Sequence, residues 1–339
     1  MASPLPPAPV GVRVRVPAKI NLALKVGARR PDGYHPLATV YHAVSLYDEV
    51  SAVWAEPEEF SVEVSGEGAA QVPLDDSNLA LRAARLLART HGPYDSLGVE
   101  LSIRKAIPVA AGLAGGSSNG AAALLACSVL WDLDVSPEAL RALAAELGSD
   151  VPFALLGGTA LGSGRGEEVV PALARGTFHW VLAFGHTGLS TPAVYRRFDE
   201  LTPRAPVPEV PDDLMNALRS GDPRQLGAAL VNDLQPAALD LQPQLRRLLD
   251  TGLELGAVGA LVSGSGPTCL PRAQRAGGDR PGRRAQRRRA LPRRAAGHRS
   301  RGGGPRHHLT RCSRYPWPEP AGAQARRAQP VGEGSSTSA

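Results

Sequence analysis

Apolar and polar residues alternate in short runs along much of the chain. Val12, Val14 and Val16 are separated by arginines, and the same alternation resumes after Pro17. A period of two is typical of a half-buried β-strand. The pattern predicts strands at residues 10–16, 20–26, 50–54, 60–64, 99–103 and 177–184.

Other segments space their apolar residues three and four positions apart, which is typical of an amphipathic helix. Residues 78–89 are the clearest case, and Asp76 or Ser77 is expected to cap that helix. Residues 121–133 are apolar on almost every side, so this helix is expected to be buried. Further helices are predicted at residues 136–147, 213–218, 225–230 and 243–255.

The mixture of these elements predicts an α+β protein with two domains. We place the boundary near residue 172, so that residues 10–172 and 173–270 form the two domains after a flexible N-terminus at residues 1–9. In the last 69 residues, Pro, Gly, Ala and Arg supply 46 positions. Such a segment cannot bury enough apolar surface to offset the entropy of ordering it, so we expect residues 271–339 to be disordered.

Charge is distributed unevenly between the body and the tail. The chain has a formal net charge of +6, yet residues 271–339 hold 17 Arg, no Lys and 3 acidic residues. Residues 1–270 are left with 21 basic and 29 acidic side chains. The body is therefore acidic, and the basic average is no indication that the body binds nucleic acid.

The cysteines and the apolar runs bear on the compartment. Cys127, Cys269 and Cys312 are isolated and lack CxxC spacing, which argues against a disulfide framework or a zinc site. Residues 1–9 do not form an export signal, and no apolar run is long enough to span a membrane. We expect a cytoplasmic protein without a membrane partner, with Cys127 in its core.

A run of small residues leads from the strand predicted at residues 99–103 into the buried helix. Small residues let the backbone close around an anion, and unpaired N–H groups at a helix start point toward it. Neither a Walker A lysine nor GxGxxG is present, so we predict a phosphate site of another kind, with a tight strand-to-helix turn as the alternative. The run is Pro108, Val109, Ala110, Ala111, Gly112, Leu113, Ala114, Gly115, Gly116, Ser117, Ser118 and Asn119.

Two charged residues and a second Gly-rich turn are further candidates. Lys19 lies within a predicted strand and is one of three lysines in a chain that uses Arg 35 times. Asp150 lies just beyond a predicted helix, among apolar neighbours. A solvated strand lysine and a capping carboxylate are the ordinary alternatives. Residues 263–268 form the second Gly-rich turn and follow an apolar run. The ordinary alternative to a functional role for this turn is a simple hairpin.

In order and spacing, these segments resemble the motifs of the galactokinase, homoserine, mevalonate and phosphomevalonate (GHMP) kinases. The four segments are residues 17–22, 112–119, 148–152 and 263–268. Within that superfamily, the chain is most similar to the 4-diphosphocytidyl-2-C-methyl-D-erythritol kinases, because of residues 29–37, 76–79 and 164–167.

The resemblance implies a two-domain GHMP-kinase fold. Its N-terminal, ATP-binding domain would be ribosomal protein S5 domain 2-like, and its C-terminal domain would be ferredoxin-like. At the position that corresponds to residue 270, the proteins of this family continue with a strand, a helix and a strand. In this sequence, an Arg-rich segment begins there instead. We therefore expect a truncated C-terminal domain and a tail produced by a frameshift.

The resemblance also implies an activity, the transfer of the γ-phosphoryl group of ATP to the 2-hydroxyl of 4-diphosphocytidyl-2-C-methyl-D-erythritol in the non-mevalonate route to isopentenyl diphosphate. Asp150 would be the general base, and Lys19 would stabilise the transferred phosphoryl group and keep Asp150 ionised. Mg²⁺ is implied as well. A hydroxyl of Ser117 or Ser118 is the only metal-ligand candidate that the sequence offers.

The same resemblance assigns substrate contacts. It places Asn21 and His35 on the substrate side, and Tyr34 and Tyr195 against the cytosine ring, where an aromatic face can stack on a base. The alternatives are turn positions for Tyr34 and His35, and a core aromatic for Tyr195. Asn78 would contact the nucleotide or cap its helix. The second Gly-rich turn would contribute Gly264, Ser265 and Gly266.

Two other functions fit parts of the sequence. Another GHMP kinase, such as a homoserine or mevalonate kinase, would share the loop and the charged pair without a nucleobase site at residues 32–35. A nucleic-acid-binding protein would act through the Arg-rich tail, but arginines without interleaved aromatics bind phosphates without reading sequence. We expect a small-molecule substrate, no specific nucleic-acid partner, and at most weak polyanion binding by the tail.

Overall fold

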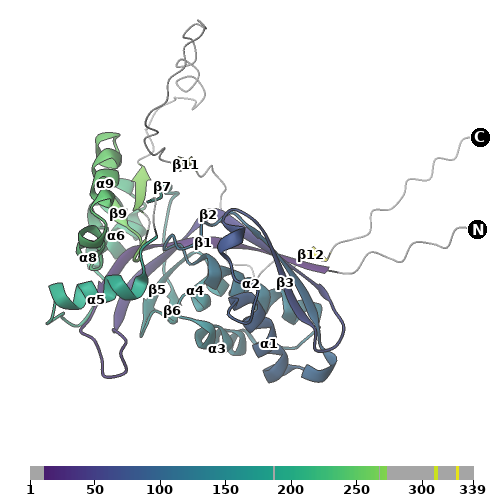
Figure 1. The fold of residues 1–339 in the computed structure, drawn as a ribbon. Helices are drawn as coiled ribbons and strands as arrows, with labels where there is room; N and C mark the ends of the chain where they lie inside the picture. The colour runs from purple at the N-terminus through teal and green to yellow at the C-terminus, as the bar shows by residue number, and fades with distance from the viewer. Residues whose placement is uncertain (1–10, 186–187, 267, 273–308, 312–325, 328–339) are drawn as a thin grey trace, which may run out of the picture.

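Figure 1 shows the computed structural model of the chain. It describes residues 11–185, 188–266, 268–272, 309–311 and 326–327. The N-terminus at residues 1–9 and most of the tail lie outside the described residues. The predicted flexibility of the N-terminus and the predicted disorder and frameshift of the tail therefore stay predictions. The domain boundary near residue 172 also stays a prediction.

Two long antiparallel strands organise the first sheet. β1 (Gly11–Val26) and β2 (Leu37–Trp54) pair along almost their whole length. The sequence pattern predicted two strands on either side of Pro17, which is wrong, because the chain passes through Pro17 without leaving the sheet. The register shifts just after Pro17, and such an irregularity accommodates a residue that has no N–H group to donate.

Further strands extend this sheet. Its order is β12-β1-β2-β4-β3, with β8 beside β1, and β5 beside both β2 and β6. The β3–β4 and β1–β8 pairs are parallel, and the other described pairs are antiparallel. The bounds are β3 (Phe60–Gly66), β4 (Val99–Lys105), β5 (Thr159–Ser163), β6 (Glu168–Pro171), β8 (Val231–Asn232) and β12 (Arg326–Arg327).

Four helices lie on one side of this sheet (Figure 1) and share a hydrophobic core with it. They are α1 (Leu79–His91), α2 (Gly115–Leu130), α3 (Pro137–Leu147) and α4 (Val151–Leu156), with 3₁₀ turns η1 (Ala69–Gln71) and η2 (Tyr94–Ser96). The α2 helix is buried on most sides, as its apolar composition predicted. Cys127 is fully buried in it, which confirms its place in the core, and burial raises the pKa of its thiol.

The cap of α1 is Asn78, and capping was one of the two roles predicted for that residue. The Asn78 side chain accepts a hydrogen bond from the N–H group of Ala80 (2.9 Å). Asp76 and Ser77 do not cap the helix, because Asp76 is paired with Arg85 and the Ser77 hydroxyl donates to a neighbouring carboxylate. The candidates Asp76 and Ser77 were therefore one or two positions too early, whereas the capping alternative for Asn78 is confirmed.

A second sheet and five helices make up the rest of the described chain. The sheet is antiparallel, in the order β11-β7-β10-β9. Its strands are β7 (His179–Ala183), β9 (Leu261–Val262), β10 (Thr268–Arg272) and β11 (Leu309–Arg311). The helices are α5 (Thr191–Leu201), α6 (Asp212–Ser220), α7 (Pro223–Ala229), α8 (Gln235–Leu241) and α9 (Gln244–Glu254).

The end of β1 joins the two halves of the fold. Leu24 and Val26 pack in one hydrophobic cluster with Val194 and Phe198 of α5 and with Val262 of β9. This mixture of sheets and helices agrees with the predicted α+β class. None of the described helices combines the length and apolarity needed to cross a bilayer.

The Gly-rich loop enters α2 earlier than the sequence predicted. The helix begins at Gly115 rather than near Ala121, although glycine and serine have low helix propensity. Tertiary contacts hold this first turn, since the buried Ser118 hydroxyl donates to the carbonyl oxygen of Pro17 (2.9 Å). Ala114 at the helix start has a left-handed φ of 57°, which is unfavourable for a residue with a Cβ atom.

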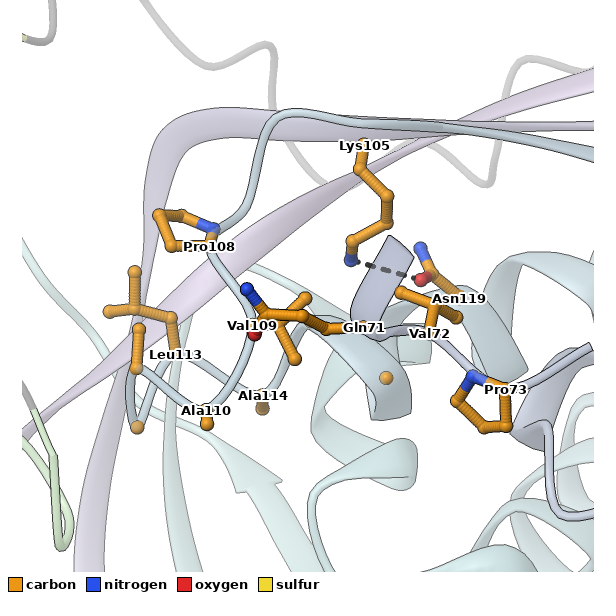
Figure 2. A pocket seen from close by; sticks show the side chains of 14 residues that line it. Gln71, Val72, Pro73, Lys105, Pro108, Val109, Ala110, Leu113, Ala114 and Asn119 are labelled. Carbon is orange, nitrogen blue, oxygen red and sulfur yellow. Dashed lines mark hydrogen bonds between the residues drawn. The ribbon is translucent and has the colours of Figure 1, made fainter. Parts of the chain in front are cut away.

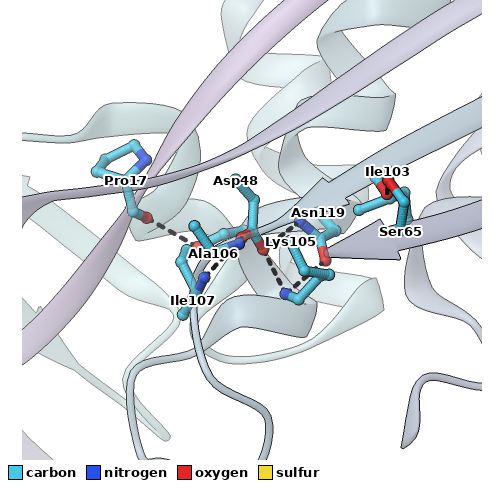
Figure 3. A network of polar contacts seen from close by, with 9 residues as sticks. Pro17, Asp48, Ser65, Ile103, Lys105, Ala106, Ile107 and Asn119 are labelled. Carbon is cyan, nitrogen blue, oxygen red and sulfur yellow. Dashed lines mark hydrogen bonds and ion pairs between the residues drawn. The ribbon is translucent and has the colours of Figure 1, made fainter. Parts of the chain in front are cut away.

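A buried polar network fixes the start of the loop (Figure 3). Asp48 of β2 is fully buried, and its Oδ1 atom accepts from the N–H groups of Ala106 (2.7 Å) and Ile107 (2.8 Å). Its Oδ2 atom accepts from the Asn119 amide (2.9 Å) and pairs with the Lys105 ammonium. Lys105 also donates to Asn119 Oδ1 (3.1 Å). The network thus joins β2, the end of β4 and the first turns of α2.

We expect Ala114→Gly to stabilise the protein, because glycine adopts a left-handed φ without a Cβ penalty. The free energy of unfolding should rise by about 0.5–1 kcal/mol after the larger entropy of glycine in the unfolded chain is subtracted. Ala121→Gly inside α2 is the matched control and should lower it by about 1 kcal/mol. Urea denaturation measures both, and equal losses in the two variants would contradict the left-handed conformation of Ala114.

We expect Asp48→Ala to lower the free energy of unfolding by about 3–5 kcal/mol, because it leaves the Lys105 ammonium buried without a counterion. Glu49→Ala is the control on the next residue. Glu49 pairs with the exposed Arg15 (3.6 Å) and Arg104 (3.1 Å), so its loss should have an effect below about 1 kcal/mol. Chemical denaturation of the two variants measures the difference, and similar effects would argue against a buried anchor.

Candidate active site

A pocket of about 260 Å³ lies between the Gly-rich loop, the start of α2 and the segment after η1 (Figure 2). Its wall includes the predicted phosphate-binding residues from Pro108 to Gly116, and Asn119, whereas Ser117 and Ser118 are not among its lining. The opposite wall was not predicted and consists of Gln71, Val72 and Pro73.

The start of α2 can bind an anion in this pocket. The N–H groups of Gly115, Gly116 and Ser117 have no acceptor within the helix, and the Ser118 N–H group is bonded to the carbonyl oxygen of Ala114 (2.8 Å). The unpaired N–H groups carry the positive end of the helix dipole. The loop therefore combines backbone donors with the space that small residues leave.

Lys105, whose ammonium is paired with Asp48, lines the same pocket. The residue is only 5% exposed, and a Cβ atom on Gly115 would lie 2.9 Å from its Nζ atom. The sequence interpretation missed Lys105. A signal was available, because Lys105 is one of the three lysines in an arginine-rich chain, the same bias that singled out Lys19.

The two predicted catalytic residues lie close together beside the loop. Lys19 Nζ is 3.5 Å from Asp150 Oδ2, although one residue comes from β1 and the other precedes α4. The backbone N–H group of Lys19 donates to the carbonyl oxygen of Leu113, in the loop (3.2 Å). The Lys19 side chain is almost buried and that of Asp150 is 30% exposed, so the carboxylate is accessible to a substrate.

Asn21 orients the lysine through a chain of hydrogen bonds. Its Oδ1 atom accepts from Lys19 Nζ (2.9 Å), and its Nδ2 atom donates to the Thr39 hydroxyl (2.8 Å). Thr39 in turn donates to the carbonyl oxygen of Ala23 (2.7 Å). The backbone N–H group of Asn21 donates to the Ser263 hydroxyl (3.1 Å). Asn21 thus connects Lys19 to the second Gly-rich turn.

That turn packs directly on the phosphate loop. A Cβ atom on Gly112, whose φ is +70°, would lie 2.6 Å from the carbonyl oxygen of Ser263, and one on Gly266 would lie 2.6 Å from the Gly112 nitrogen. The two Gly-rich segments are therefore in close contact up to residue 266, while Pro267 lies outside the described residues.

Two residues that the sequence interpretation missed support the same turn. The Asn232 amide donates to the carbonyl oxygens of Val262 (2.6 Å) and Gly264 (2.8 Å). Thr191 of α5 and Ser265 share a hydrogen bond between their hydroxyls (2.8 Å). The sequence did not single out Asn232 or Thr191, because each forms its hydrogen bonds with residues that are remote in the sequence.

Two of the predicted substrate residues, His35 and Tyr195, form a small cluster, and Tyr34 precedes His35 in the chain. The His35 Nε2 atom lies 2.7 Å from Asp199 Oδ1, and its ring centroid lies 4.9 Å from that of Tyr195. Tyr34 is 53% exposed, and the Arg165 guanidinium lies 4.9 Å from its ring centroid. Tyr34 therefore presents an accessible aromatic ring, while Tyr195 is partly covered by His35.

Tyr41 of β2 lies beside Lys19 and was not predicted. Its ring centroid is 5.4 Å from Lys19 Nζ. Burial, followed by the charge of Asp150, raises the pKa of its hydroxyl well above its usual range. Burial and Asp150 also raise the pKa of Tyr195. Both phenols are thus kept protonated beside an anionic group.

Three remaining candidates have other contacts. Asn78 caps α1 and donates through Nδ2 to the carbonyl oxygen of Pro73 (2.7 Å), so it supports the pocket wall without lining it. The Ser118 hydroxyl is committed to Pro17, whereas no hydrogen bond to another described residue engages the Ser117 hydroxyl. Among the described residues, no cluster of three His, Cys, Asp or Glu side chains is arranged to hold a metal ion.

Comparison with known proteins places this site in a family. The family described as GHMP kinases N terminal domain matches residues 78–158, and GHMP kinases C terminal matches residues 214–293. Together these matches confirm the two-domain GHMP-kinase fold that the motifs predicted.

Three individual proteins are similar to the chain over most of their length. A 4-diphosphocytidyl-2-C-methyl-D-erythritol kinase of Thermobifida fusca is 57% identical over 268 residues, covering 77% of this chain and 87% of the relative. The enzyme of that name from Mycolicibacterium smegmatis is 56% identical over 262 residues, covering 76% and 80%. A crystal structure of a 4-(cytidine 5'-diphospho)-2C-methyl-D-erythritol kinase has a TM-score of 0.62 at 35% identity, covering 77% and 90%. The chain therefore belongs to the GHMP kinases and, within them, to the 4-diphosphocytidyl-2-C-methyl-D-erythritol kinase family.

Proposed function

We propose that this chain transfers the γ-phosphoryl group of ATP to the 2-hydroxyl of 4-diphosphocytidyl-2-C-methyl-D-erythritol, a step of the non-mevalonate route to isopentenyl diphosphate. The observation that carries the proposal is the approach of Lys19 to Asp150, 3.5 Å apart, beside a loop whose backbone donors suit phosphate oxygens. Membership of the family supports the choice of both substrates.

Asp150 and Lys19 divide the chemistry between them. The Asp150 carboxylate accepts the proton of the 2-hydroxyl as that oxygen forms its bond to the γ-phosphorus, while the bond from the γ-phosphorus to the bridging oxygen breaks and ADP leaves. The Lys19 ammonium stabilises the negative charge on the transferred group. Because phosphoryl transfer depends mostly on positioning and charge stabilisation, two well-placed side chains and the loop supply most of what the protein must contribute.

The pocket accounts for the nucleotide. The N–H groups at the start of α2 would bind phosphate oxygens, and the wall at Gln71, Val72 and Pro73 would contact the rest of ATP, while the Lys105–Asp48 pair holds the base of the loop. Asn78 would not contact ATP itself. It would hold Pro73, which lines the pocket, in place through a hydrogen bond to the Pro73 carbonyl oxygen. We propose that Mg²⁺ enters with the phosphates, since it usually keeps several waters and takes few protein ligands. The Ser117 hydroxyl is the ligand that the described residues offer, and the ion would neutralise phosphate charge.

The cytidine moiety is assigned to the cluster around His35. The exposed ring of Tyr34 offers a stacking face, and stacking of a base on an aromatic side chain contributes about 1–3 kcal/mol. Tyr195 lies beside His35, and we assign Asn21, Gly264, Ser265 and Gly266 to further contacts with the substrate. Neither homoserine nor mevalonate has a nucleobase that could bind to this cluster. We propose a cytoplasmic enzyme without a nucleic-acid partner.

An acceptor panel tests the proposal. We expect the full chain, supplied with ATP and Mg²⁺, to release ADP with 4-diphosphocytidyl-2-C-methyl-D-erythritol at a kcat/KM at least about a hundredfold above that with homoserine or mevalonate, because only the first engages the polar and aromatic cytidine site. A coupled ADP-release assay with one enzyme preparation measures all three. Preferred turnover of homoserine or mevalonate would replace the assignment with another GHMP kinase activity.

Substitution of the catalytic pair tests the mechanism. We expect Asp150→Asn and Lys19→Met each to lower kcat by about 10²–10³-fold, because each removes a charge that acts in the transition state. KM for ATP should change by only a few fold. Asp134→Asn and Lys25→Met are controls of the same chemistry, since Asp134 is exposed and Lys25 pairs with Asp233 (2.6 Å) away from the pocket. Retention of more than a tenth of the activity in Asp150→Asn would exclude it as the base.

A further inference from the structure

Thr39 lies in β2, at the centre of the first sheet. It pairs with Leu24 of β1 on one side and with Gly162 of β5 on the other. The residue is fully buried, and a Cβ atom on Gly162 would lie 2.8 Å from the γ-methyl carbon of Thr39. The methyl group therefore fills the space that the glycine leaves, and a valine would fill that space as well.

The Thr39 hydroxyl has a single hydrogen, and its neighbours determine where that hydrogen goes. The hydroxyl oxygen lies 2.7 Å from the carbonyl oxygen of Ala23, and a carbonyl oxygen can only accept a hydrogen bond. The hydroxyl must therefore donate its hydrogen to Ala23. Toward any other neighbour, the Thr39 oxygen can act only as an acceptor.

This direction fixes the orientation of the Asn21 side chain. The two ends of an amide have almost the same shape but opposite hydrogen-bonding character, so its orientation follows from its partners. The end of Asn21 that lies 2.8 Å from the Thr39 hydroxyl must be the Nδ2 donor. The Oδ1 acceptor is then directed to Lys19 Nζ, 2.9 Å away. One of the two Nδ2 hydrogens remains for the substrate contact assigned to Asn21.

Lys19 requires that acceptor because its ammonium is buried. The Lys19 side chain is 9% exposed, and burial of a charge without hydrogen-bond partners is costly. Asn21 Oδ1 is nearer to Lys19 Nζ than Asp150 Oδ2, which lies 3.5 Å away. A reversed amide would place its NH₂ group against the ammonium, so that two donors would meet without an acceptor. The ammonium would then move from its place beside Asp150.

The other contacts of Asn21 hold its position without selecting the orientation of its amide. The Asn21 backbone N–H group donates to the buried Ser263 hydroxyl (3.1 Å). A Cβ atom on Gly264 would lie 3.6 Å from Asn21 Oδ1 and 3.9 Å from Lys19 Nζ, so the second Gly-rich turn covers this contact. Thr39 is therefore the partner that selects between the two orientations of the amide.

We infer that Thr39 is a positioning residue of the phosphoryl transfer, because its hydroxyl sets the direction of the Asn21 amide and thereby holds the Lys19 ammonium beside Asp150. The inference rests on the proposed function, since the position of Lys19 affects the rate only if Lys19 stabilises the transferred group. Thr39 is fully buried, so it acts through Asn21 and not by contact with a substrate.

Two substitutions separate the hydroxyl of Thr39 from its methyl group. Thr39→Val keeps the packing at Gly162 and removes the hydroxyl, so kcat should fall about tenfold, because displacement of a catalytic group is costly. KM for ATP should stay within about twofold. Thr39→Ser keeps the hydroxyl and should retain at least about half of the native kcat, although loss of the methyl group lowers its melting temperature. In a merely structural role, kcat would follow the melting temperature. Equal losses of kcat in the two variants would overturn the inference.

Thr159 of β5 supplies the matched control. It is also a buried strand threonine, and its hydroxyl forms a hydrogen bond with His42 Nδ1 (2.8 Å). Thr159→Val should therefore change kcat by less than about twofold. The effect of Thr39→Val on kcat should also disappear in the Lys19→Met background, because that variant has no ammonium to orient. A further tenfold loss in that background would show that Thr39 acts by another route and would overturn the inference.

A readout without turnover separates this inference from the proposed function. Thr39→Val should lower the melting temperature less in the Asn21→Leu background than in the native chain, because the amide that needs the hydroxyl is already absent. Such non-additivity is the signature of residues in contact. Equal losses in both backgrounds would overturn the inference, whatever the substrate. Non-additive losses in a chain that phosphorylates none of the three acceptors would reject the proposed function and retain the orientation of Asn21.

Discussion

An ammonium and a carboxylate that lie far apart in the chain meet in this protein beside a loop of unpaired backbone donors. Lys19 and Asp150 are 3.5 Å apart, and nothing in the local structure of either would bring this about. The long strand β1 fixes Lys19, the start of α4 fixes Asp150, and α2 between them starts at the phosphate loop. The chemistry depends on these three elements keeping one arrangement.

Close approach of backbone segments maintains that arrangement. Gly112 and Gly266 lie so near each other that a Cβ atom on either residue would overlap the backbone of the facing segment. The loop is also tied at its base through Asp48, which bonds two N–H groups, an amide and an ammonium in a fully buried network. Glycines allow the approach and buried polar contacts hold it, so the geometry of the site depends on both.

The sequence predicted the parts whose signal is local. The small residues of the loop predicted a pocket wall that the structure contains, and the motifs around Lys19 and Asp150 predicted two side chains that lie close together. It failed where tertiary contacts outweigh local preference. Pro17 interrupted a strand in the sequence but lies within β1, and α2 starts at Gly115 because burial compensates for low helix propensity. Asp48, Lys105, Asn232 and Tyr41 were missed, since each acts on residues remote in sequence.

The most direct test of the account is a crystal structure of the chain with 4-diphosphocytidyl-2-C-methyl-D-erythritol and an ATP analogue whose β,γ-bridge cannot be cleaved. The account predicts that an Asp150 carboxylate oxygen lies within about 2.6–3.2 Å of the 2-hydroxyl oxygen, with the γ-phosphate beside Lys19 and the N–H groups at the start of α2. A γ-phosphate bound elsewhere, or a 2-hydroxyl group out of reach of Asp150, would contradict it.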